Sequence, residues 1–129
     1  MRETAEAIVG GITGTRSAPR MLLLARYDSD GDLAYVGRTT TLPAAAGNTL
    51  APLLSSPMPG HPWEGWSFSA GWGTSKTLDV TLVEPEVVVE VVADVARDAS
   101  GRWRHPARWH RVRTDLSPTE IARTRRPPE

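Results

Sequence analysis

The sequence contains no cysteine and a single lysine, Lys76. The absence of cysteine excludes disulfide bonds, thiolate metal sites and thiol nucleophiles. Lys76 is the one candidate amine nucleophile, but nothing beside it in "GTSKTLD" would activate it. We therefore expect Lys76 to be an ordinary surface residue.

Long hydrophobic runs are missing as well. The longest apolar run, Met21–Ala25, is far too short to span a membrane, and no signal-peptide pattern opens the sequence. We expect a cytoplasmic protein, in the bacterial cytosol or nucleoid, with no membrane partner. With 129 residues, of which 40% are hydrophobic and 23% charged, the sequence predicts a single domain over residues 1–129.

Net charge is also absent, but the charges are unevenly distributed. Residues 1–101 carry seven basic and twelve acidic side chains, whereas residues 102–129 carry eight arginines and three acids. A basic segment on an acidic body indicates a localised anion-binding face. A solvated arginine-rich tail is the alternative interpretation.

Strand patterns dominate the sequence. Apolar and β-branched runs predict strands at 6–13, 20–28, 33–40 and 103–113, and two strands or one bent strand within 78–98. The break within 78–98 is expected near Glu84, because Pro85 cannot donate a hydrogen bond to a neighbouring strand. The "DSDG" stretch at 28–31 is typical of a tight hairpin turn. Adjacent glycines at Gly10 and Gly11 suggest a bulge or a close backbone approach.

A helix is expected midway through the chain, near residues 43–55, where Pro43 precedes apolar residues at helical spacing. Ser117 and Glu120 have capping-box spacing, which predicts a short C-terminal helix over 117–125. Five hairpin-linked strands with one inserted helix are typical of a small antiparallel OB-fold barrel, an all-β class with minor helix. An SH3-like barrel is the nearest alternative. We expect the OB-fold core to cover about residues 5–121, followed by an Arg/Pro-rich tail at 122–129.

Common catalytic and metal-binding patterns do not occur in the sequence. His105 and His110 would point to opposite faces of a strand, and His61 lies in a loop without a neighbouring Asp or Cys. No third group marks a Ser-His-Asp triad, and there is no GxxxxGK[ST] phosphate loop. We expect no metal site and no cofactor bound by this chain alone.

The basic run "RWRHPARWHRVRTDL" (102–116) has the clearest binding chemistry. It holds five arginines against one acid, Asp115, and planar guanidinium groups suit phosphate oxygens. Arg111 and Arg113 share one face of the expected strand. Trp103 and Trp109 are candidates for base stacking, although core positions are favoured in so small a chain.

Four segments of the sequence carry a family resemblance. "EAIVGGITG" (6–14) is similar to a first OB strand, and "LLLARYDSDGDLAYVGRTT" (22–40) to a "LLLG.YD..G.L.YVGR" hairpin. "TLVEPEVVVEV" (81–91) resembles "VEPELVVEV", and "GRWRHPARWHRVRTDL" (101–116) resembles "GR.RHP.RF.R.R.DK". In this order, over about residues 5–121, they resemble the C-terminal OB domain of bacterial ATP-dependent DNA ligases, in particular the actinobacterial type. The last segment is that family's nucleotidyltransferase motif VI.

The resemblance implies a role for the basic run. In this family, motif VI faces ATP while an active-site lysine attacks the α-phosphate and pyrophosphate leaves. By their positions in the motif, Arg111, Arg113 and Asp115 would orient the β- and γ-phosphates. The family's lysine after the aspartate is Leu116 here. Contacts to DNA or phosphate are expected from other members of the run, namely Arg102, Arg104, Arg108 and Trp109.

The adenylated lysine of the family lies in a K-x-D-G motif of an upstream nucleotidyltransferase domain, and this motif does not occur in the sequence. We therefore expect the chain alone to be inactive as a ligase. ATP and Mg²⁺ would enter through the nucleotidyltransferase domain, in cis or in trans, and the DNA partner would be a nicked duplex. A second hypothesis is a stand-alone OB module that binds single-stranded nucleic acid without enzymatic activity. Preference for nicked duplex over single strand separates the two.

Overall fold

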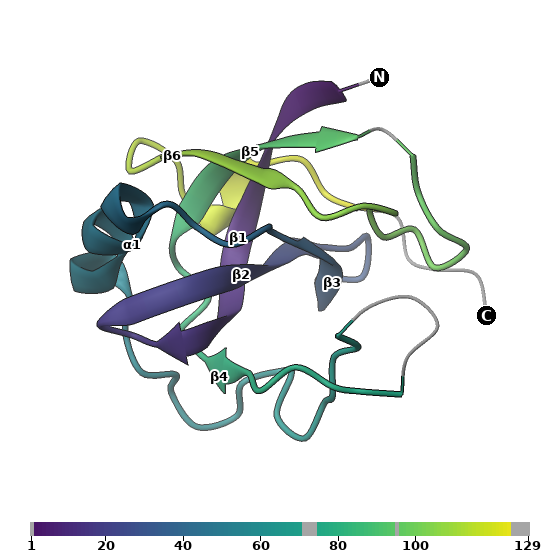
Figure 1. Cartoon of the computed structure of the whole chain (residues 1–129). Coiled ribbons are helices and arrows are strands. Elements are labelled where there is room, and N and C mark those ends of the chain that lie inside the picture. The colour runs from purple at the N-terminus through teal and green to yellow at the C-terminus, as the bar shows by residue number, and fades with distance from the viewer. Residues whose placement is uncertain (1, 71–74, 95, 125–129) are drawn as a thin grey trace.

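The computed structural model has one antiparallel sheet and one short α-helix (Figure 1). The structure describes residues 2–70, 75–94 and 96–124. Its strands are β1 (Arg2–Thr15), β2 (Ala18–Tyr27), β3 (Leu33–Arg38), β4 (Thr81–Leu82), β5 (Val88–Asp94) and β6 (Arg108–Val112). Its helices are α1 (Ala44–Leu50) and the 3-10 turns η1 (Ala51–Leu53) and η2 (Pro118–Glu120). The expected all-β class with a helix inserted midway is confirmed.

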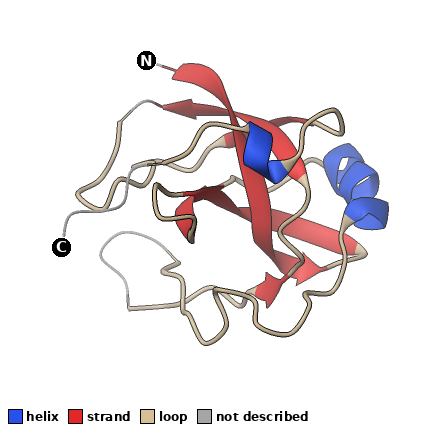
Figure 2. Ribbon diagram, turned by 180° about the vertical axis from the view of Figure 1, so that it is seen from behind, coloured by secondary structure: helices blue, strands red, loops and turns tan. Residues whose placement is uncertain are grey.

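The sheet is OB-like but is not closed by a continuous ladder. The strands hydrogen-bond in the order β3-β2-β1-β5-β6, and β4 pairs with the later part of β1. Figure 2 shows the strands and helices from the side opposite to Figure 1. Within the described residues, β3 and β6 are therefore the edges. An isolated parallel bridge between Thr39 and Ala107 joins them, and the Ala107 N–H donates to the carbonyl of Arg38 at 2.8 Å. The two edges thus meet at one point.

The last strand is shorter than the predicted 103–113. It begins at Arg108 because the residues before it do not pair with β5. The Ala107 N–H bonds to β3, and the Arg104 N–H donates to the carbonyl of Ala96, beyond the end of β5, at 3.0 Å. The Trp103 N–H donates to the carbonyl of Val36 at 2.7 Å, and Pro106 has no N–H to offer. Residues 103–107 therefore cross from one edge of the sheet to the other.

The two glycines of β1 produce both of the expected features. The register with β2 shifts between Val9 and Gly11, which marks a bulge. The Trp63 ring lies against Gly10 so closely that a Cβ atom there would be 2.5 Å from the ring. Trp63 is only 1% exposed, and its indole N–H donates to the carbonyl of Leu33 at 2.8 Å. Gly10 therefore leaves room for Trp63, the most buried aromatic side chain among the described residues.

Both faces of the sheet are buried, which explains the nearly continuous apolar runs. Alternate residues of β2 and β5 enter two different apolar clusters. The first cluster includes α1 and contains Leu22, Leu24 and Leu50. The second includes the irregular segment after η1 and contains Trp63 and Phe68. This irregular segment covers residues 54–70, while 71–74 lie outside the described residues.

The predicted helix over 117–125 is wrong in extent. Glu120 does accept hydrogen bonds from the N–H and hydroxyl of Ser117, at 2.9 and 2.8 Å, so the capping interaction forms. The helix nevertheless ends after one 3-10 turn, because Ile121 turns extended and enters the second apolar cluster. The Thr124 N–H then donates to the carbonyl of Tyr27 at 3.0 Å. Of the predicted tail at 122–129, residues 125–129 lie outside the described residues.

No helix in the described part of the chain combines the length and the apolar character needed to cross a membrane.

Candidate functional site

A buried carboxylate gathers the basic side chains of β6. Glu90 lies on β5 directly opposite Arg111, and its side chain is only 10% exposed. Arg111 donates from Nε to Oε2 at 3.1 Å, and Arg113 donates from Nη1 to Oε1 at 3.2 Å. His110 places Nε2 3.3 Å from Oε2. The Arg111 hydrogen bond is the main cause that holds the pKa of Glu90 below its ordinary value.

Arg113 forms a fork with Asp115. Its Nε and Nη2 atoms donate to the two carboxylate oxygens, both at 2.9 Å. This two-point contact lowers the pKa of Asp115 to about 2 and raises the pKa of Arg113. Arg113 is thus held by two carboxylates, those of Asp115 and Glu90, and its side chain is only 19% exposed. We call Glu90, Arg111, Arg113 and Asp115 the Glu90 cluster. Both arginines bond to Glu90, and Asp115 joins the cluster through Arg113.

The structure brings together the three predicted motif VI residues. Arg111 and Arg113 reach the same carboxylate, that of Glu90. Arg113 and Asp115 lie beyond the end of β6, where the Arg113 N–H still bonds to the carbonyl of Val88 at 2.8 Å. Sequence reasoning missed Glu90. The available signal was a lone acid inside the apolar run 87–93.

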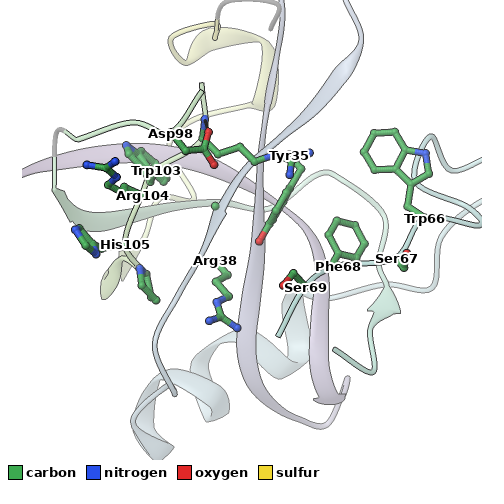
Figure 3. Close-up of a pocket in the computed structure, with 13 residues that line it drawn as sticks. Tyr35, Arg38, Trp66, Ser67, Phe68, Ser69, Asp98, Trp103, Arg104 and His105 are labelled. Carbon is green, nitrogen blue, oxygen red and sulfur yellow. Dashed lines mark hydrogen bonds between the residues drawn. The ribbon is translucent and has the colours of Figure 1, made fainter. Parts of the chain in front are cut away.

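A separate cavity of about 570 Å³ lies between β3, residues 66–69 and residues 98–106 (Figure 3). We call it the Tyr35 pocket. It combines aromatic and basic side chains, and its lining includes Tyr35, Arg38, Trp66, Phe68, Asp98 and Arg104. None of the four residues of the Glu90 cluster lines it.

The wall formed by residues 98–106 is held by short local contacts. Asp98 Oδ1 accepts hydrogen bonds from two N–H groups of its own turn, including that of Arg102 at 3.0 Å. The Arg102 guanidinium lies 5.0 Å from the centre of the Tyr35 ring, in a cation–π arrangement. The Trp103 indole packs closely against Gly37 beneath this segment. A Cβ atom added at Gly37 would lie 3.0 Å from the indole. Burial raises the pKa of Tyr35.

The aromatic wall is a connected group of rings. Trp66 stacks on Trp63, with 5.8 Å between ring centres and an interplanar angle of 18°. Phe68 packs edge-on against Tyr35 at 4.9 Å. Trp66 is 50% exposed, whereas Trp63 and Phe68 are buried. A buried set of rings therefore supports one exposed indole at the pocket.

The basic run 102–116 is divided between these two places. Arg102 and Arg104 line the Tyr35 pocket, whereas Arg108 is exposed at the start of β6. Trp103 is buried at 6% exposure, and Trp109 is partly buried against the first apolar cluster. The core placement favoured for the two tryptophans is therefore confirmed for Trp103. The proposed DNA contacts of Arg102, Arg104, Arg108 and Trp109 stay predictions.

The three histidines lie in different surroundings. His61 is buried, and its Nδ1 accepts a hydrogen bond from the Trp63 N–H at 3.0 Å. Its Nε2 therefore carries the proton and donates to the carbonyl of Gly10 at 3.1 Å. His105 lines the Tyr35 pocket from a position before β6, so the expected opposition to His110 across one strand is wrong.

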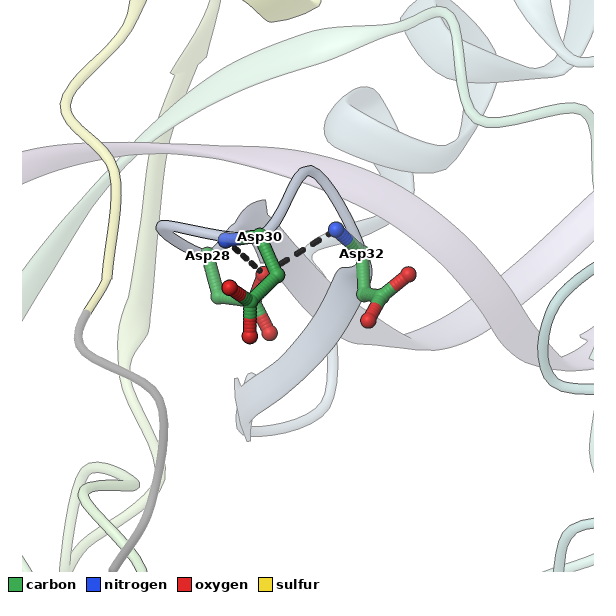
Figure 4. A group of neighbouring side chains, drawn as sticks. All are labelled: Asp28, Asp30 and Asp32. Atoms are coloured by element: carbon green, nitrogen blue, oxygen red, sulfur yellow. Dashed lines mark hydrogen bonds between the residues drawn. The ribbon is translucent and has the colours of Figure 1, made fainter.

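Three aspartates meet at the β2–β3 turn, which was expected only as a tight turn. Carboxylate oxygens of Asp28, Asp30 and Asp32 lie within 4.8 Å of one another (Figure 4). Asp28 is buried, and its Oδ1 accepts from the N–H groups of the other two at 2.9 and 3.0 Å. These contacts and a positive φ of 83° at Gly31 account for the turn.

Comparison with known proteins identifies the family. Residues 15–116 match the family model of the ATP-dependent DNA ligase C-terminal region. The chain belongs to this family. The resemblance stated from the sequence motifs is therefore confirmed.

Ligase relatives align with nearly the whole chain. It is 35% identical over 133 residues to DNA ligase C of Mycobacterium tuberculosis (strain ATCC 25618 / H37Rv), covering 89% of this chain and 36% of the relative. It is 31% identical over 134 residues to DNA ligase C2 of Mycolicibacterium smegmatis (strain ATCC 700084 / mc(2)155), covering 88% and 37%. This ligase-family chain thus spans just over a third of the length of these curated relatives.

Solved ligase structures share the fold. The ligase domain of M. tuberculosis LigD superposes with a TM-score of 0.70 at 26% identity, covering 95% of this chain and 39% of that one. Mycobacterial DNA ligase D complexed with ATP and MES gives a TM-score of 0.63 at 25% identity, covering 94% and 38%.

Proposed function

We propose that this ligase C-terminal region assists lysine adenylylation in a nucleotidyltransferase domain and contacts nicked duplex DNA. The observation that carries the proposal is the Glu90 cluster, which holds Arg111, Arg113 and Asp115 in one fixed arrangement. A preorganised guanidinium can stabilise charge that develops on a leaving phosphate without reorganising during the reaction. Pyrophosphate is such a leaving group.

The contacts divide the work within the cluster. Arg111 is 58% exposed and is held through Nε alone, while its two terminal nitrogens have no hydrogen bond or ion pair within the described residues. These nitrogens form a fork suited to phosphate oxygens. All three side-chain nitrogens of Arg113 already donate hydrogen bonds to carboxylates, and the side chain is largely buried. We therefore assign phosphate contact to Arg111 and positioning to Arg113, Asp115 and Glu90.

The DNA contacts are proposed for the remaining part of the basic run. Arg102, Arg104 and Arg108 are exposed, and each can neutralise a backbone phosphate. Trp109 packs against the core, so only the accessible part of its ring is available to DNA. ATP and Mg²⁺ would be bound through the nucleotidyltransferase domain. Membership of the ligase family favours this proposal over a stand-alone single-strand-binding module.

A chimaera tests the proposal. The chain replaces the matching segment of M. tuberculosis DNA ligase C, and the rate of covalent labelling by α-labelled ATP is measured. Arg111→Ala is expected to slow labelling by about tenfold, since a charge-assisted contact to the departing phosphates is lost. Arg16→Ala is the matched control, because Arg16 is an exposed arginine in the β1–β2 turn and lies outside the cluster. Equal labelling by both variants would reject the assignment.

A further inference from the structure

We propose that the Tyr35 pocket binds a single unstacked nucleotide, supplied by an unpaired position of a DNA strand. Its volume of about 570 Å³ lies within the range of small-ligand sites. The inference rests on the proposed function only in taking DNA as the source of the nucleotide. It extends the DNA contact proposed for Arg104 by naming an unpaired nucleotide as what the pocket holds.

Trp66 provides a stacking surface for a base. Trp63 stacks on one face of its indole and the residue is 50% exposed, so we place the base on the face away from Trp63. Trp63 is fixed in turn by its hydrogen bond to the carbonyl of Leu33 and by close packing on Gly10. A rigidly supported indole loses little conformational freedom when a base stacks on it. Phe68 and Tyr35 extend the apolar wall beside it.

Two arginines supply unpaired positive charge. Arg38 and Arg104 both line the pocket, and neither guanidinium has a hydrogen bond or ion pair within the described residues. Asp98 is the one acid of the lining, and its Oδ1 is already occupied by N–H groups of the turn. The charge therefore selects an anion and disfavours the cationic ligands that aromatic cages otherwise bind.

An aromatic ring joined to an anion is the chemistry of a nucleotide. Bases within a duplex are stacked on both faces, so they cannot reach Trp66 without leaving the helix. An unpaired nucleotide at an overhang or a gap has its base free. A free mononucleotide offers the same chemistry, and the experiment below separates the two sources.

Binding of a fluorescein-labelled dT8 strand to the full chain is measured by anisotropy, with a blunt duplex and AMP as competitors. Trp66→Ala is expected to weaken dT8 binding by about fivefold or more, and Trp66→Phe to retain most of it, because any aromatic face can stack. Arg104→Gln is expected to weaken binding by about threefold to tenfold, through loss of one phosphate contact. Met58→Ala and Arg16→Gln are the controls, since both residues are exposed and neither lines the pocket.

Several outcomes would refute the proposal that the Tyr35 pocket binds a nucleotide. These are no saturable binding of dT8 by the wild-type chain, equal losses in the pocket and control variants, or Trp66→Phe as weak as Trp66→Ala. Equal losses of blunt-duplex binding and dT8 binding in Trp66→Ala would also contradict it, because a stacked duplex base cannot reach Trp66. Displacement of dT8 by micromolar AMP would support nucleotide binding by the pocket but would refute the claim that the nucleotide comes from DNA. A photocrosslink from 5-iododeoxyuridine to Trp66 or Tyr35 would support the placement directly.

The two proposals fail in different assays. The Tyr35 pocket shares no lining residue with the Glu90 cluster, so adenylylation in the ligase chimaera reports on the cluster and dT8 binding reports on the pocket. Normal dT8 binding with no adenylylation defect in Arg111→Ala would reject the proposed function and retain the pocket. No dT8 binding together with slow adenylylation in Arg111→Ala would reject only the proposal that the Tyr35 pocket binds a nucleotide.

Discussion

Replacing Gly10 by alanine tests the contact that supports the aromatic wall of the Tyr35 pocket. A Cβ atom at this position would lie 2.5 Å from Cζ3 and 2.6 Å from Cη2 of Trp63. Carbon atoms pack best at about 3.5–4.0 Å, so the ring must retreat by roughly 1 Å. That movement pulls on the Trp63 indole, whose N–H bonds to the carbonyl of Leu33 at 2.8 Å.

The expected cost follows from two opposing effects. Overpacking of this kind costs about 1–3 kcal/mol, while alanine recovers about 0.5–1 kcal/mol of the backbone entropy that glycine loses in a strand. We expect Gly10→Ala to lower the free energy of unfolding by about 1–2 kcal/mol. That corresponds to a fall in Tm of roughly 4 °C for each kcal/mol.

Urea unfolding of four variants decides the cause. Trp63→Phe shortens the ring, so adding Gly10→Ala in that background is expected to cost less than about 0.5 kcal/mol. Gly47→Ala in α1 is the matched control: its Cβ would meet nothing closer than the Pro19 carbonyl at 3.4 Å. It is expected to leave stability unchanged or to raise it by up to about 1 kcal/mol. If Gly10→Ala lowers the free energy of unfolding equally in wild type and in the Trp63→Phe variant, the packing argument is refuted.

Three further predictions concern the charged residues. Glu90→Gln is expected to slow adenylylation in the ligase chimaera by about threefold to tenfold, because Arg111 loses the charge that holds its Nε, and an unchanged rate would remove Glu90 from the positioning role. The pKa of Asp115 is about 2 in the fold, below its unfolded value of about 3.9, so its contribution to stability is complete above pH 4 and is lost as the pH falls toward 2. Urea unfolding should therefore separate wild type from Asp115→Asn at pH 6 and much less at pH 2, and a constant difference would contradict the pairing with Arg113. Duplex DNA binding should weaken with salt at a log–log slope of roughly −3 to −5, and Arg108→Gln should reduce that slope by about 1; binding that ignores salt would contradict an electrostatic contact.

Local patterns were sufficient to predict most of the strands. The first three strands, the hairpin at 28–31 and the break before β5 depend on neighbouring residues, such as Pro85 with its missing N–H. The double glycine in β1 also correctly predicted a bulge and a close approach. The partner that approaches, Trp63, is more than fifty residues away in the sequence, and no local pattern identifies it.

Features that depend on pairing between distant segments could not be predicted. The capping box at Ser117 is present, yet the helix stops because Ile121 is more stable inside the second apolar cluster. Residues 103–107 were expected to belong to the last strand. Only tertiary structure shows that Trp103 and Ala107 bond to β3, while Arg104 bonds to Ala96 beyond the end of β5. Glu90 faces Arg111 through the β5–β6 register, which a single sequence does not specify. The Tyr35 pocket likewise depends on the fold as a whole.

The most direct test of the central claim compares two steps of ligation on the same protein. Lysine adenylylation and sealing of a pre-adenylylated nick are timed separately in the ligase chimaera, for wild type and for Arg111→Ala. If Arg111 acts on the departing phosphates, adenylylation should slow by about tenfold while sealing changes far less, because pyrophosphate has already left at the second step. Equal slowing of both steps would make Arg111 a plain DNA contact, and an unchanged adenylylation rate would contradict the assignment of the Glu90 cluster.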